Sequence, residues 1–309
     1  MMTRYSIVIL LCISISAPAQ KVAPAFDWLS RFSNTRDFTI NKTEVYFTIQ
    51  SPNEDISSIA CIKKINGQWS KPELVHFTGY YRDIEPFLSN DGLRLYFSSN
   101  RPTTETDTFT KDYDIWYVER KNITDNWSKA INIGTPVNTL YNEFYPSVTA
   151  NRSIYYTSDA PNSTGKDDIF LSTWTGEKYN NPLPLDSNIN SAGYEFNAYV
   201  APDERFIIYT MYGRKDGLGS GDLYISIRQQ NGEWGKARNL GPIINSKQMD
   251  YCPFVDIGNN MLYFTSKRSN IKTENYTSLK DFEKAINQYE NGQSRIYKIS
   301  LQDILKDIK

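Results

Sequence analysis

The sequence predicts an all-β fold, a single five-bladed β-propeller, and the first observation behind this prediction is an internal repeat of roughly 55 residues. In each repeat an acid opens one strand-like segment, a turn of Asn, Asp or Gly follows, and a second segment ends on Tyr, an apolar residue and Ser or Thr. This template occurs at 85–101, 143–159, 195–214 and 250–268. Self-similarity of this period is typical of propellers and solenoids.

The second observation is that each repeat contains two more short segments. The third segments are 114–118, 168–172, 222–226 and 294–299, and the fourth, each led by an aromatic residue, are 68–75, 126–134, 178–185 and 233–241. All are rich in Tyr, Phe, Ile and Val and bounded by turn residues, which predicts antiparallel strands. Four such strands make one propeller blade.

The third observation is a constant spacing between repeats. An interval of 16 residues separates the aromatic residue of each fourth segment from the next opening acid: Trp69 to Glu85, Trp127 to Glu143, Tyr179 to Glu195 and Trp234 to Asp250. We therefore expect the outer strand of each blade to enter the next inner strand through a connection of fixed length.

The propeller is expected to occupy residues 20–309. Its predicted repeats are 38–80, 81–139, 140–191, 192–246 and 247–300. The fifth repeat lacks an aromatic-led fourth segment, whereas the N-terminus has an extra one at 26–32, with Trp28 in the aromatic position. This segment is predicted to complete the last blade, which closes the ring and removes exposed sheet edges.

Residues 1–19 have the pattern of a signal peptide. Arg4 precedes an apolar stretch at 7–15, and Ala17-Pro18-Ala19 provides small residues for cleavage, so we expect a periplasmic or secreted protein. No window reaches about 18 consecutive apolar residues, so no membrane span is predicted. With 34 basic and 35 acidic residues there is no net field to attract nucleic acid.

The remaining cysteines and the single histidine favour neither a disulfide nor a histidine-based catalytic or metal site. Cys61 and Cys252 could pair in an oxidising compartment, but the repeat places them on different strands of their blades, so we expect them to be unpaired. A single histidine, His76, weakens any mechanism that needs a histidine base or a multi-histidine metal site.

Several short motifs resemble the WD40-like propeller repeats of TolB and related bacterial envelope proteins. They are Glu-x-x-Pro at 143–146, Asn-Asp-Gly at 90–92, Leu-Tyr-Phe-Ser-Ser-Asn-Arg at 95–101 and Asp-Ile-x-Tyr at 114–117. The resemblance covers about residues 38–300 and implies an envelope propeller. TolB itself has six blades, which is the alternative blade count, and an additional N-terminal domain, so its partners are not carried over.

The two faces of the predicted ring differ in loop length. On one face the hairpins are tight turns, such as 90–92 and 202–204. On the other face the interval from the second-strand Tyr to the third strand is 18, 13, 13 and 31 residues. Variable loops on a rigid scaffold usually carry binding sites, so this loop-rich face is the predicted functional face.

Charged residues repeat on the loop-rich face and are the candidate ligand-binding residues. They are the opening acids Glu85, Glu143, Glu195 and Asp250, the third-strand acids Asp114, Asp168 and Asp222, and the loop cations Arg101, Arg214 and Arg268. One interpretation is structural: the acids accept hydrogen bonds from loop amides and cations. The other is that carboxylates converge at the channel mouth on Ca²⁺ or on a cationic or hydroxyl-rich ligand.

The preferred function is a non-catalytic binding or scaffolding propeller that engages an envelope or extracellular protein, peptide or glycan, with no cofactor other than a candidate Ca²⁺. The alternative is a carbohydrate-active or other hydrolase with two acids at the channel. The acids occupy equivalent repeat positions, which favours a structural role over catalysis. An amphipathic helix at 279–290, over the same face, and a final helix at 301–308 are also predicted.

Overall fold

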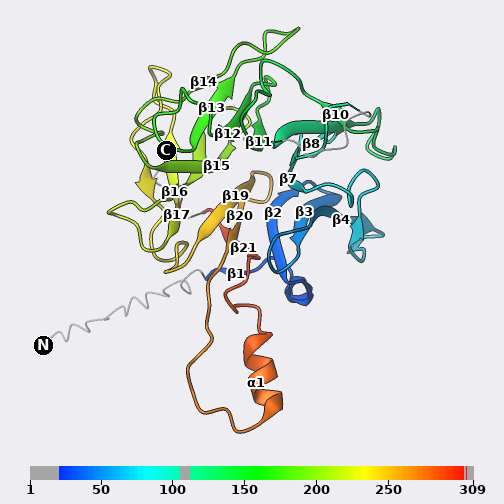
Figure 1. Cartoon of the computed structure of the whole chain (residues 1–309), viewed down its shortest axis with the longest axis vertical. Coiled ribbons are helices and arrows are strands. Elements are labelled where there is room, and N and C mark those ends of the chain that lie inside the picture. Colours follow the sequence, from blue (N-terminus) through cyan, green and yellow to red (C-terminus); the bar gives the residue numbers. More distant parts are fainter. Residues whose placement is uncertain (1–20, 105–111, 303, 305–309) are drawn as a thin grey trace, which may run out of the picture.

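The computed structural model describes residues 21–104, 112–302 and 304, and it confirms the five-bladed β-propeller: five antiparallel sheets form a ring (Figure 1). Blade one comprises β2 (Asn34–Ile40), β3 (Glu44–Gln50), β4 (Ser57–Ile65), β5 (Gln68–Trp69) and β6 (Glu73–Leu74). Blade two comprises β7 (Asp83–Leu88), β8 (Arg94–Ser99), β9 (Asp114–Glu119) and β10 (Ile131–Asn132).

The other three blades repeat this meander from the centre outwards. Blade three comprises β11 (Glu143–Val148), β12 (Ile154–Ser158), β13 (Asp168–Ser172) and β14 (Leu183–Pro184). Blade four comprises β15 (Tyr194–Val200), β16 (Phe206–Tyr212), β17 (Gly221–Ile227) and β18 (Arg238–Asn239). Blade five comprises β19 (Asp250–Asp256), β20 (Met261–Ser266), β21 (Arg295–Ser300) and β1 (Ala23–Pro24).

The ring is closed by an N-terminal strand, but the prediction that 26–32 forms it is wrong. The closing strand is β1, in which Ala23 pairs with Lys298, whereas Asp27–Arg31 forms a 3₁₀ helix. The apolar spacing explains the difference: Leu29 follows Phe26 by three residues, one 3₁₀ turn, and becomes buried in the core. The first inner strand also begins earlier than predicted, at residue 34 instead of 38.

Each inner strand contains one β-bulge at the same position in the blade. Five residues with positive φ mark these bulges, and we call them the bulge residues: Asp37 (53°), Glu85 (61°), Tyr145 (51°), Asn197 (51°) and Cys252 (52°). In four blades a second-strand hydroxyl of the preceding blade accepts the hydrogen bond of the bulge N–H: Thr48 with Glu85, Ser98 with Tyr145, Thr157 with Asn197 and Thr265 with Asp37. This contact explains the Ser or Thr that ends the second-strand motif.

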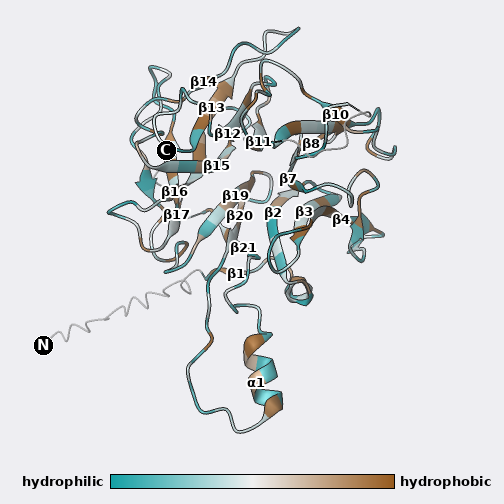
Figure 2. Cartoon of the chain, viewed as in Figure 1, coloured by the Kyte–Doolittle hydropathy of each residue, from teal (hydrophilic) through white to brown (hydrophobic). Residues whose placement is uncertain are grey.

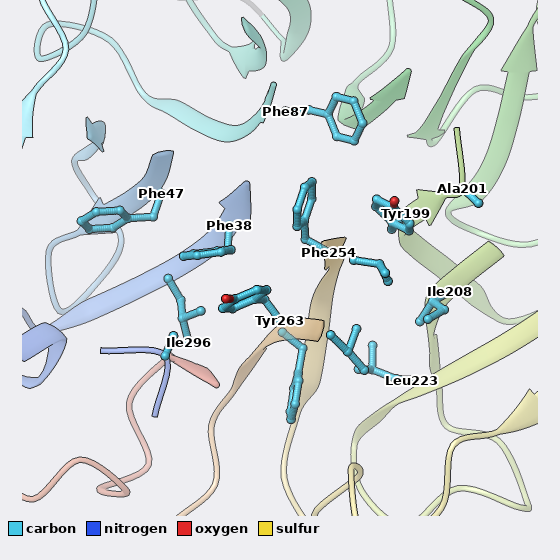
Figure 3. Packing of buried hydrophobic residues seen from close by; sticks show 14 of the residues in the cluster. Phe38, Phe47, Phe87, Tyr199, Ala201, Ile208, Leu223, Phe254, Tyr263 and Ile296 are labelled. Carbon is cyan, nitrogen blue, oxygen red and sulfur yellow. The ribbon is translucent and has the colours of Figure 1, made fainter. Parts of the chain in front are cut away.

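Aromatic rings from the inner strands of four blades pack together (Figure 3). The ring of Phe254 lies 5.3 Å from that of Tyr199, 6.2 Å from that of Phe87 and 6.4 Å from that of Phe38, measured between centroids. Phe38 also stacks on Tyr263 at 4.2 Å. The Phe254 ring therefore packs against rings from three other blades.

Helix α1 (Leu279–Ile286) extends away from the ring and shows alternating hydrophobic and hydrophilic faces (Figures 1 and 2). The hydroxyl of Ser278 caps it by accepting from the N–H of Asp281, as the sequence predicted, but the helix ends four residues before 290. The predicted signal peptide at 1–19 lies wholly outside the described residues. The predicted helix at 301–308 lies mostly outside them.

Two predictions about membrane spans and cysteine pairing can be compared with the structure. Within the described ranges, no helix is long and apolar enough to cross a membrane. Cys61 and Cys252 are both buried and free, as expected from their different strand positions.

Candidate functional site

The opening acid of blade two is Asp83, not Glu85, which corrects the sequence alignment. In β7 the residue opposite the end of the second strand is Asp83, paired with Ser99, just as Glu143 pairs with Ser158 and Asp250 with Ser266. The interval from Trp69 to Asp83 is 14 residues, so the constant interval of 16 holds for three connections and not for the first. The error arose because acids occupy both 83 and 85.

Two of the opening acids are held by arginines. Asp83 accepts from the Arg101 guanidinium at 2.6 Å and from the Thr78 hydroxyl at 2.8 Å. Asp250 accepts from Arg268 at 3.0 Å. In both blades the same arginine also donates to a backbone carbonyl of the incoming connection, so the acid fastens that connection to its blade.

Among the residues that the structure describes, no arginine pairs with the other two opening acids. Glu143 accepts from the amide and hydroxyl of Thr139, and Glu195 accepts from the amide and hydroxyl of Ser191. Burial raises the pKa of Glu143 to about 8 and also raises the pKa of Glu195. These carboxyls fasten the same connection through uncharged donors, whose hydrogen bonds to the two carboxyl oxygens oppose the effect of burial on the pKa.

The third-strand acids hold the variable loops. Asp168 accepts from the amides of Thr164 and Gly165, and Asp222 from those of Leu218 and Gly219. Asp114 accepts from the Asn132 side chain. All three acids are buried, while Arg214 forms an exposed pair with Asp216 at 3.1 Å.

Glu85 is the one predicted residue that lines a pocket at the loop-rich mouth of the channel, a cavity of about 290 Å³. The residue before each bulge contributes to its wall: Arg36, Ile84, Phe144, Phe196 and Tyr251. Further lining residues are Glu54, Thr157, Asp167, Asn197, Met249 and Lys267. Every blade thus contributes at least one side chain, and three of the five wall residues are aromatic.

Arg36, Glu85 and Asn197, which line the pocket, form a network of charged and polar groups with Asp37, and we call these four residues the floor. Arg36 donates to Asp37 at 2.8 Å and to Glu85 at 2.9 Å, and Asn197 donates to Glu85 at 3.3 Å. The other Glu85 oxygen accepts from the Tyr145 amide at 2.7 Å. Both carboxylate oxygens of Glu85 therefore have partners.

Burial dominates the electrostatics of the floor. It raises the pKa of Glu85 to about 7, and the nearby Arg36 charge only partly opposes this. Burial also raises the pKa of the Cys252 thiol well above its usual value, so the thiol remains protonated and is a poor nucleophile. In the described part of the chain no three His, Cys, Asp or Glu side chains could together hold a metal ion, so the acids named for Ca²⁺ do not form such a group.

Sequence reasoning missed most of the pocket because it searched for residues that repeat. Arg36, Asn197 and Asp167 have no equivalent of the same type in the other blades, and the three aromatic wall residues were counted as ordinary strand residues. A usable signal was present: the two positions that follow each opening acid differ in chemistry between repeats.

No family model matches this chain, and no curated protein matches it. Solved structures do: TolB from Acinetobacter baumannii is 11% identical with a TM-score of 0.49, over 87% of this chain and 55% of that one. A structure of BT0996 in an RGII complex is 8% identical with a TM-score of 0.54, over 92% and 91%. One described as "Glycoside hydrolase" is 7% identical with a TM-score of 0.52, over 91% and 90%.

These likenesses show the fold alone, because every identity is far below 25%. TolB-type propellers are among the structural neighbours, and this chain spans about half the length of the Acinetobacter baumannii protein. Propellers with very different functions share this architecture, so the site has to be judged by its own chemistry.

Proposed function

We propose that this chain is a non-catalytic binding propeller of the bacterial envelope or cell exterior, which takes one end of a protein, peptide or glycan ligand into the loop-face pocket. The observation that carries the proposal is the pocket itself: an aromatic wall above a polar floor at the centre of the loop-rich face. Ligand sites commonly combine apolar walls with a few placed polar groups in this way.

The state of the floor acids favours binding over hydrolysis. A glycosidase needs one carboxylic acid that can donate a proton to the substrate and a second carboxylate that is free to attack or to activate water. The side chains of Glu85 and Asp37 are 3% and 1% exposed, and both are paired with Arg36. Their carboxylate oxygens accept hydrogen bonds from the protein and are therefore not free to act on a substrate.

A hydrolase is the second candidate, and one observation favours it. The pKa of Glu85, raised to about 7 by burial, is in the range of a general acid, and Asp167 lines the same pocket. Two carboxyl groups in one cavity with different surroundings are a pattern found in active sites.

Parallel measurements of binding and turnover separate the two functions. Isothermal titration of wild type and Phe196→Ala against glycan and peptide panels should reveal ligands that wild type binds and the variant binds at least tenfold more weakly, since the variant removes part of the wall. Glycan panels incubated with wild type should show no new reducing ends. Hydrolysis that Glu85→Gln abolishes would establish the hydrolase, and binding that is unchanged in Phe196→Ala would remove the pocket from the function.

The proposed location rests on residues 1–19 and is tested separately. Expression in a bacterial host followed by mass spectrometry of the exported protein should find a mature N-terminus at Gln20. Retention of Met1 in the cytoplasmic fraction would contradict export.

A further inference from the structure

The charges around the loop-face pocket do not balance. Arg36 is shared by two carboxylates, Asp37 and Glu85, so this group carries a net negative charge when Glu85 is ionised. Lys267 is neutralised by Glu54, with which it pairs at 3.7 Å.

Asp167 adds a second uncompensated negative charge at the pocket. Within the described residues no hydrogen bond or ion pair engages its carboxylate, although its backbone carbonyl accepts from the amide of Glu195. The neighbouring acids Asp159 and Asp168 strengthen the negative field, and Lys166 weakens it. A half-buried carboxylate without a partner is unfavourable by itself, and a ligand cation would compensate it.

The wall of the pocket suits a cation as well. Phe144, Phe196 and Tyr251 come from three successive blades and present aromatic rings to the cavity. The faces of such rings carry negative potential and attract ammonium groups within about 6 Å. The guanidinium of Arg36 already lies 5.2 Å from the Tyr251 ring centroid, which shows that this wall accommodates a positive group.

We propose that the loop-face pocket binds the ammonium group of its ligand, with Phe144 and Phe196 as the aromatic contacts and Asp167 as the counter-charge. The proposal rests on the proposed binding function and narrows it to ligands that end in an amine or quaternary ammonium. An anionic group would meet the uncompensated carboxylates, and a neutral sugar would leave Asp167 without a compensating charge.

Matched pairs of small molecules test the charge directly. Choline and its uncharged isostere 3,3-dimethyl-1-butanol have nearly the same shape, so titration followed by NMR isolates the effect of the positive charge. N-acetyl-lysine methylamide and N-acetyl-norleucine methylamide do the same for a peptide side chain and separate a peptide source from a quaternary headgroup source. We expect the charged member of at least one pair to bind about tenfold more tightly, which corresponds to about 1.4 kcal/mol.

Two variants assign that preference to the pocket. Asp167→Asn should weaken binding of the charged probe about tenfold and leave the neutral isostere unchanged. Phe196→Leu keeps an apolar wall but removes the ring, so it should lower only the preference for the charged probe. Asp203→Asn, an exposed acid on the tight-turn face, is the control and should change nothing. Unfolding curves of all three variants establish that they are folded.

The outcomes separate this inference from the function on which it rests. Equal affinity for charged and neutral probes, or binding of a neutral glycan that Asp167→Asn leaves intact, overturns the ammonium site and preserves a binding pocket. If no probe, peptide or glycan binds in a manner sensitive to Phe196, both proposals fail.

Discussion

Two rings of residues lie two positions apart in the inner strands, and they behave in opposite ways. The opening acids Asp83, Glu143, Glu195 and Asp250 are the same chemical type in four blades, are buried, and fasten the connections between blades. The bulge residues Asp37, Glu85, Tyr145, Asn197 and Cys252 differ in every blade. Positions that repeat maintain the ring, whereas positions that vary shape the channel.

The opening acids also differ among themselves in an instructive way. Each of the two aspartates pairs with a second-strand serine, and an arginine, Arg101 or Arg268, lies two residues after that serine. At the equivalent positions the blades with glutamates have Ala160 and Gly213, and the longer side chain reaches the connection without an arginine. The same fastening is thus achieved in two blades with an ion pair and in two blades with uncharged amide and hydroxyl donors.

The largest effect is expected for Asp83→Ala. The change leaves the Arg101 guanidinium, whose side chain is 10% exposed, without its counter-charge. Breaking such a buried pair lowers the free energy of unfolding by about 3 to 5 kcal/mol. Urea denaturation measures the loss, and Glu119→Gln, which breaks the half-exposed pair with Arg94, is the control expected to stay under about 1 kcal/mol. A loss as small as that of the control would show that Asp83 does not hold the connection.

The next effect concerns pH and distinguishes the glutamate blades. The pKa of Glu143 is raised to about 8 in the folded state from about 4.5, so between these values the folded state binds the proton that the unfolded state has lost. Stability should therefore fall as pH rises from about 4.5 to about 8. Glu143→Gln should remove part of this decline, on the order of a few kcal/mol, in unfolding curves measured from pH 5 to 8. An unchanged slope would mean that Glu143 is ionised in the fold.

How far the sequence could predict this molecule follows from the same contrast. The blades and their order were predictable because the second strands end on Ser or Thr, which makes the same contact in four blades, and the loop-rich face was predictable from the loop lengths. Glu85 was assigned to the wrong ring because the inner strand of blade two has acids at both 83 and 85, and only the strand pairing distinguishes them. The pocket walls were missed because Phe144 and Phe196 read as ordinary strand residues, and only the packing of neighbouring blades around the channel brings them to one pocket.

A smaller effect is expected at the bulge residues, where Glu85→Gln should alter ligand affinity more than the free energy of unfolding. Glu85→Gln keeps the shape of the side chain and removes a charge that is present mainly above about pH 7. The groups that face Glu85 are Arg36, Asp37, Asn197, the Ser98 hydroxyl, the Cys252 thiol and the amide of Tyr145. Choline affinity of wild type should rise several-fold from pH 6 to pH 8, since the carboxylate becomes ionised, and this rise should be smaller in the variant.

Titrations at both pH values, with unfolding curves alongside, test the claim. Glu195→Gln is the matched control because it alters an opening acid that does not line the pocket. A loss of stability in Glu85→Gln as large as that in Asp83→Ala would remove the distinction between the two rings.

The smallest effect is expected for Arg214, which the sequence placed beside Arg101 and Arg268 as a loop cation. It lies one position beyond the residue equivalent to those two arginines, and it pairs with Asp216, whose side chain is 53% exposed, instead of with Glu195. An exposed pair is screened by water, so Arg214→Gln should change the free energy of unfolding by less than about 1 kcal/mol and leave choline affinity unchanged. A loss approaching that of Asp83→Ala would mean that Arg214 reaches Glu195 after all, and that the glutamate blades also depend on an arginine.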